Sequence, residues 1–78
     1  MKNTPHELHE EFPEYVDKMS ELKSINAHFA KMFDDYHQIN REVHRGETDV
    51  EPMSDDHLNE LRRKRMHLKD EIYALLNN

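Results

Sequence analysis

Apolar side chains recur along the first half of the chain at alternating steps of four and three residues. The repeat runs from Tyr15 to Val43 without an intervening glycine or proline. Such steps place side chains along one face of an α-helix, so the pattern predicts a long helix over residues 13–45. The positions of this face are Tyr15, Met19, Leu22, Asn26, Phe29, Phe33, Tyr36, Asn40 and Val43.

A second apolar row, spaced by seven residues, flanks this face at Ile25, Met32 and Ile39. The two rows together make an apolar stripe that is wider than a two-stranded coiled coil requires. The long helix is therefore expected to face more than one neighbour.

A second helix is predicted over residues 54–76. Arg45 followed by Gly46 is a typical helix end, and residues 46–53 form a connector. Ser54 is a favourable N-cap for the helix that follows. A connector this short makes the two helices antiparallel neighbours. The apolar stripe of the second helix is Leu58, Leu61, Arg65, Leu68, Ile72, Leu75 and Leu76, with one arginine among its members.

Pairing Val43 with Leu58 fixes the register of this hairpin and places Tyr36 opposite Arg65. The second helix then ends where the first reaches about residue 25. Residues 12–24 are left without a partner, a length of about 20 Å as helix. Either the chain bends near residues 24–26, with Asn26 starting a new helix, or two molecules bury the segment together. We expect a bend combined with some self-association.

The unpartnered segment supplies the candidate protein interface. Its apolar members are Phe12, Tyr15, Val16, Met19, Leu22 and Ile25. Before it, Thr4-Pro5-His6-Glu7 is a typical helix start, and Pro13 ends any helix that begins there. Residues 1–11 are therefore expected to form a short helical segment or a partly ordered tail.

Composition agrees with charged helices that associate. Of the 78 residues, 35% are hydrophobic and 36% charged, with one glycine and no cysteine. A single small domain with so few apolar residues usually needs a staple or a partner, and disulfides are excluded here. No apolar run is long enough to cross a membrane, and the first residues lack a signal-peptide pattern. We expect a cytoplasmic protein that does not bind membranes.

No residue pattern predicts catalysis, a cofactor or a small-molecule substrate. His6 and His9, or His37 and His44, share a helix face and could approach a metal ion. None of the seven histidines lies on the main apolar face, so we expect surface histidines rather than ligands. The many carboxylates lack the enclosing pocket that would separate the pKa values of an acid–base pair. An enzyme is not expected.

The densest basic segment suggests an alternative function. The net charge is −6, but Arg62, Arg63 and Lys64, with Lys69, form a basic cluster that could bind nucleic acid. Successive residues of a helix point in different directions, however, which weakens this interpretation. Arg65 lies on the apolar stripe, where its stem can pack on Tyr36 while its guanidinium pairs with an acid. If its charge serves only to snorkel, Arg65→Leu should keep or raise the melting temperature, whereas pairing with a buried acid would make the same replacement destabilising by a few kcal/mol; we expect the first outcome.

Several sequence motifs resemble those of the YdcH-like family, whose members are small bacterial proteins with a domain of unknown function. The motifs are Phe12-Pro13-Glu14-Tyr15, Asn26-Ala27-His28-Phe29, Met32-Phe33-Asp34, Tyr36-His37, Glu42-Val43-His44-Arg45 and residues 64–72. The resemblance covers about residues 12–76. It implies a helical hairpin with coiled-coil character and brings no established activity, ligand or catalytic residue.

These observations predict an all-α antiparallel helical hairpin with coiled-coil character and a short N-terminal helical segment. The expected function is a non-enzymatic interaction module that binds itself or an unidentified protein. The alternative is a small nucleic-acid-binding protein. Salt separates the two, because nucleic-acid binding weakens steeply with ionic strength, whereas burial of apolar surface does not.

Overall fold

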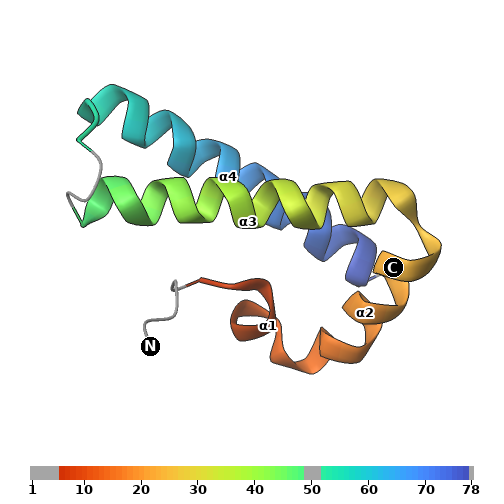
Figure 1. Ribbon diagram of the computed structural model, residues 1–78. Helices are drawn as coiled ribbons and strands as arrows, with labels where there is room; N and C mark the ends of the chain where they lie inside the picture. Colours follow the sequence, from red (N-terminus) through yellow and green to blue (C-terminus); the bar gives the residue numbers. More distant parts are fainter. Residues whose placement is uncertain (1–5, 49–51, 78) are drawn as a thin grey trace.

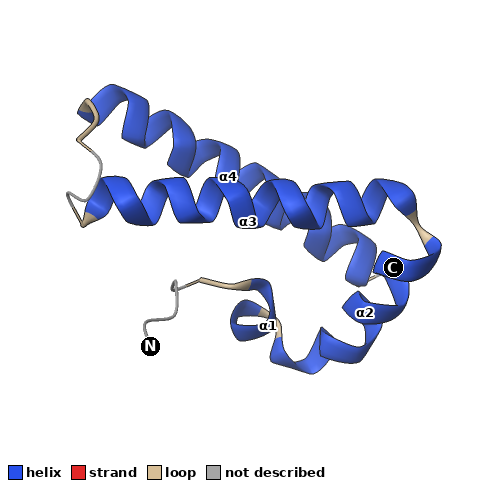
Figure 2. Ribbon diagram, viewed as in Figure 1, coloured by secondary structure: helices blue, strands red, loops and turns tan. Residues whose placement is uncertain are grey.

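The computed structural model describes residues 6–48 and 52–77, and this part of the chain is helical with no strand (Figure 2). The predicted all-α class is thus confirmed. The helical segments, in chain order, are α1 (Leu8–Glu11), the 3₁₀ turn η1 (Pro13–Tyr15), α2 (Val16–Ile25), α3 (Ala27–Glu47) and α4 (Asp55–Leu76). Among the described residues, no helix is long and apolar enough to span a bilayer.

The two long helices, α3 and α4, pack against each other as an antiparallel hairpin, as predicted (Figure 1). One core cluster joins Phe29 and Ile72, and a second cluster near the connector joins Val43 to Leu58. These are the pairs expected from the register of the two apolar stripes. The side chain of Ser54 accepts a hydrogen bond from the backbone N–H of His57, so it caps α4.

The chain breaks at Asn26 and turns back on itself. Its backbone is extended there, and its side-chain oxygen accepts the backbone N–H of Phe29 at 3.0 Å, which caps α3. The segment from α1 to α2 consequently folds back along the hairpin instead of extending beyond it (Figure 1). Lys18 on α2 donates a hydrogen bond of 2.6 Å to the carbonyl of Leu76 and so satisfies the last turn of α4.

The N-terminal segment contains a short helix, one of the two outcomes that the sequence left open. Residues 8–11 form α1, and Leu8 is completely buried in the same cluster as Met19 and Phe29. We call residues 6–12 the arm. The burial of Leu8 was not predicted, because one leucine among charged residues carries no periodicity. The predicted helix start at Thr4 lies outside the described residues.

Gly46 has a different role from the predicted one. Helix α3 continues through it to Glu47, and its φ is not positive. A Cβ at this position would lie 2.7 Å from the sulfur of Met53 and 3.0 Å from a methyl group of Leu58. Glycine is therefore explained by the close approach of the next segment rather than by a left-handed cap. Residues 49–51 of the predicted connector lie outside the described part.

Candidate functional site

The candidate interface at residues 12–25 is largely used within the chain itself. Met19 is 3% exposed in the main core, and Phe12, Tyr15 and Leu22 pack against that core as half-buried side chains. Val16 is 45% and Ile25 72% exposed. Of the two outcomes considered for the overhang, the structure shows the folded-back one.

Three aromatic rings fasten this segment to α4. The ring of Phe12 stacks on Tyr73 with centroids 5.3 Å apart, and Tyr15 meets both rings edge-on at 6.4 and 6.2 Å. Offset and edge-to-face ring pairs stabilise contacts beyond the area they bury. The aromatic residues that the sequence offered as an intermolecular interface therefore have an intramolecular role.

The basic residues 62–69 do not form one cationic surface. Arg62 donates to the carboxylate of Glu47 at 2.8 and 3.0 Å, and Lys69 donates to Glu11 at 2.6 Å. Arg63 and Lys64 are exposed. Two of the four candidates are therefore neutralised by carboxylates of the same chain, and the others lie on different sides of α4.

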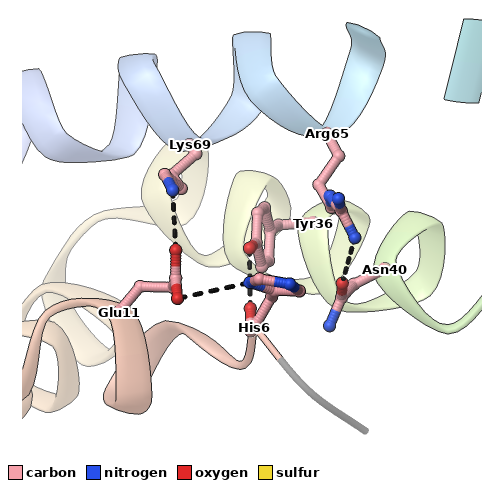
Figure 3. Close-up of polar contacts among 6 residues, drawn as sticks. All are labelled: His6, Glu11, Tyr36, Asn40, Arg65 and Lys69. Carbon is pink, nitrogen blue, oxygen red and sulfur yellow. Dashed lines mark hydrogen bonds and ion pairs between the residues drawn. The ribbon is translucent and has the colours of Figure 1, made fainter. Parts of the chain in front are cut away.

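A polar network holds the arm against the hairpin (Figure 3). The Tyr36 hydroxyl donates a hydrogen bond of 2.7 Å to the backbone carbonyl of His6. Glu11 lies between two cationic or potentially cationic groups, 2.6 Å from Lys69 Nζ and 3.4 Å from His6 Nδ1. Beside them Arg65 donates to the side-chain oxygen of Asn40 at 3.0 Å. The acid expected as the partner of Arg65 is thus replaced by an amide.

Two of these groups have shifted pKa values. The hydrogen bond from Lys69 holds the pKa of Glu11 below its usual 4.5, against a smaller opposing effect of burial. Burial, followed by the negative charge of Glu11, raises the pKa of Tyr36 to about 12. Both shifts move the pKa further from pH 7, so Glu11 stays ionised and Tyr36 stays protonated at that pH. Neither is poised to exchange a proton as a general acid or base does.

His37 is buried, contrary to the expectation of surface histidines. It is 8% exposed, its ring lies against Phe33 with centroids 4.5 Å apart, and its Nδ1 lies 2.6 Å from the carboxylate of Glu7. Its Nε2 is buried without a hydrogen-bond partner among the described residues. The contact with Glu7 therefore fixes the orientation of the ring through Nδ1.

The histidines do not assemble a metal centre in the described part of the chain. No three histidine or acidic side chains there lie close enough together to hold a metal ion. His6 contacts Glu11 and His37 contacts Glu7, so both histidines instead fix the arm.

The other side of the hairpin carries an uncovered groove between α3 and α4. We call this surface the open face. It has two hollows, of about 410 Å³ around Ile39 and Leu68 and of about 270 Å³ around Met32 and Leu75. Eight of its eleven lining residues follow the same steps of four, three and four on both helices: His28, Met32, Asp35 and Ile39 on α3, and Lys64, Leu68, Glu71 and Leu75 on α4. The other three are Gln38, His67 and Ala74.

The sequence pattern predicts one half of this groove. The row at Met32 and Ile39 indicated that α3 faces more than one neighbour, and both residues line the open face. The half on α4 was missed because Leu68 and Leu75 were assigned to the stripe that packs inside the hairpin. Both are half-buried, so each contributes to the core and to the groove.

Comparison with known proteins places the hairpin in a family. Residues 29–76 match the family model described as "Protein of unknown function (DUF465)". The chain is a member of the DUF465 family. It is 31% identical over 65 residues to the "Uncharacterized protein YdcH" of Escherichia coli K12 and to that of Shigella flexneri, which covers 83% of this chain and 88% of each relative. No solved structure matches the chain.

The DUF465 match begins at Phe29 and so covers most of the hairpin but not the arm. Ten of the eleven residues that line the open face lie within the matched range, with His28 immediately before it. The arm residues His6, Glu7 and Glu11 lie outside. The resemblance to YdcH-like proteins is thereby confirmed, and it supplies a family without an assigned activity.

Proposed function

We propose that this DUF465 protein is a non-enzymatic interaction module that binds protein through its open face. The observation that carries the proposal is the groove between α3 and α4, which no other segment of the described chain covers. Apolar side chains line it at two hollows, and charged side chains border both. Such a surface on a small helical protein is typical of a site for another helix.

The proposal moves the interface away from residues 12–25. That segment was expected to associate because the hairpin left it unpartnered, and the fold satisfies it by turning back at Asn26. Self-association through apolar surface therefore draws on the open face, with Ile25 and Val16 as the remaining exposed members of the earlier set. A cytoplasmic location stays a prediction from the sequence.

A catalytic role is not favoured by the groups that titrate abnormally. Glu11 and Tyr36 both hold the arm in place, and their shifted pKa values stabilise the forms present at neutral pH. Two helices and a short arm also form shallow hollows rather than an enclosed cavity that would exclude water from a reaction.

Sedimentation equilibrium from low to high micromolar concentration tests the proposal. We expect concentration-dependent association that is weakened by Leu75→Gln in the open face and unaffected by Val16→Gln in α2. Far-UV circular dichroism of both variants checks that the helices are retained. A stronger effect of Val16→Gln would return the interface to the N-terminal segment.

Binding of a protein other than itself is the second form of the same proposal. If the wild-type chain stays monomeric, capture from native cells with the Leu75→Gln variant as a negative control identifies partners of the open face. Fluorescence anisotropy with a DNA or RNA oligonucleotide tests the nucleic-acid alternative. Saturable binding that weakens steeply with salt and requires Arg63 and Lys64 would support that alternative.

A further inference from the structure

The open face contains a pair of opposite charges, Lys64 and Glu71, that are not paired with any described residue. Lys64 and Glu71 are both exposed on α4 and make no ion pair within the described residues. They are seven residues apart, a rise of about 10 Å along the helix, which is too far for a direct bond between them. Leu68 lies between them on the same face, one turn from each.

The order of charges along this face of α4 is complementary to the same face of a second α4 that runs in the opposite direction. If a second α4 lies antiparallel to the first across a twofold axis beside Leu68, Lys64 of one copy faces Glu71 of the other, and the symmetry repeats the pair. The two copies of Leu68 then meet at the centre. A parallel arrangement would instead place Lys64 opposite Lys64 and Glu71 opposite Glu71, and like charges in such positions are repulsive.

We propose that the occupant of the open face is a second copy of this chain, with α4 antiparallel to α4 and two Lys64–Glu71 ion pairs flanking paired Leu68 side chains. The inference rests on the proposed function, because it names the partner and the geometry of the same surface.

The α3 side of the groove fits the same twofold axis. The register that pairs Val43 with Leu58 and Phe29 with Ile72 places the midpoint between Lys64 and Glu71 beside α3 between Met32 and Asp35. Reversal of the second copy then brings Met32 of one chain towards Asp35 of the other, and His28 towards Ile39. The charge of Asp35 near the axis is neutralised by Lys31 of its own chain at 3.1 Å.

Charge reversal gives a direct test. Lys64→Glu and Glu71→Lys, each alone, convert both ion pairs into like-charge pairs, and we expect each to weaken the dimer by about tenfold. The double variant restores both pairs with the signs exchanged and should associate like the wild type. A mixture of the two single variants should form heterodimers more tightly than either variant binds itself.

Arg63 and Asp70 supply a matched control. They are also seven residues apart on α4, carry opposite charges and are exposed, but they do not line the open face. Arg63→Glu and Asp70→Lys should leave the dimer unchanged, and mixing them should give no preferred heterodimer. Circular dichroism of every variant separates loss of association from loss of the fold.

The outcomes distinguish this geometry from the proposed function. Preferred pairing of Lys64→Glu with Glu71→Lys supports the antiparallel dimer. Association of the wild-type chain that is insensitive to these variants would overturn the dimer geometry and leave the interaction module standing. A wild-type chain that stays monomeric at high micromolar concentration would overturn the second copy as the occupant.

Discussion

The hydroxyl of Tyr36 in the middle of α3 donates a hydrogen bond of 2.7 Å to the backbone carbonyl of His6, thirty residues earlier in the chain. His6 has a φ of 64°, a left-handed conformation that side chains other than glycine adopt at a cost of about 1 kcal/mol. The hydrogen bond therefore holds the beginning of the arm in a conformation that it would not keep alone, and it joins the arm to the hairpin.

Replacement of Tyr36 by phenylalanine should loosen this junction. The ring still fills the core, but the carbonyl of His6 loses its donor, so we expect a loss of about 1–2 kcal/mol in the free energy of unfolding. Urea denaturation measures the loss, and faster amide exchange in the arm localises it. Tyr73→Phe is the control, because Tyr73 is partly exposed and meets Phe12 and Tyr15 through its ring. Equal losses in the two variants would contradict the role assigned to the hydroxyl.

The same phenol makes stability depend on pH in the alkaline range. Its pKa rises from 10 in the unfolded chain to about 12 in the folded one, so folding disfavours the phenolate. This contribution to stability is complete below pH 10 and is lost as pH rises towards 12. The urea midpoint of the wild-type chain should therefore fall further across this range than that of Tyr36→Phe. If the urea midpoints of the two proteins fall in parallel with rising pH, groups other than Tyr36 account for the alkaline loss of stability.

The hairpin register could be predicted because it depends on periodicity alone. Steps of four and three mark a face on each helix, and the short connector makes the faces meet with Val43 near Leu58 and Phe29 near Ile72. The break at Asn26 was one of two outcomes that the sequence left open, since a seam asparagine can either cap a helix or fix a register.

Contacts of the arm could not be predicted in this way. Leu8 is a single apolar residue in a four-residue helix, so no period indicates that it is buried. The burial of His37 depends in turn on the arm, whose Glu7 contacts it. Periodicity also identifies which face Arg65 occupies, but not which atom its guanidinium reaches. Only the α3 side of the open face could be predicted, because the apolar row that includes Ile39 makes the stripe of α3 wider than packing against α4 alone requires.

Acid should release the arm through Glu11. Its pKa is lower in the folded chain than the usual 4.5, so the contribution of the ionised carboxylate is complete above that value and is lost as pH falls through the lowered one. Glu11→Gln should cost about 1 kcal/mol at neutral pH, because the pair with Lys69 is partly exposed. The two proteins should become equally stable in acid. Glu10→Gln, at an exposed neighbouring position, should leave the free energy of unfolding unchanged. A stability difference between the wild-type chain and Glu11→Gln that does not change with pH would contradict the role assigned to Glu11.

The contact between Arg65 and Asn40 reverses what the sequence predicts for the replacement of Arg65. Arg65→Leu was expected to keep or raise the melting temperature, on the view that the side chain does no more than snorkel. The structure shows its guanidinium donating to the buried Asn40 side chain at 3.0 Å. Loss of this charged donor should destabilise the fold by about 1–3 kcal/mol. The exposed Arg63→Leu on the same helix should have little effect.

A double-mutant cycle isolates the pair. In an Asn40→Ala background the amide oxygen is already absent, so Arg65→Leu should cost clearly less there than in the wild-type chain. Thermal and urea unfolding of the four proteins measure the difference. An equal loss in both backgrounds would show that Arg65 acts through its aliphatic stem against Tyr36, and a gain in stability would restore the snorkelling interpretation. Because Asn40 lies on the apolar face of α3, a measured coupling would make it, with Arg65, a polar pair that fixes the register of α3 against α4.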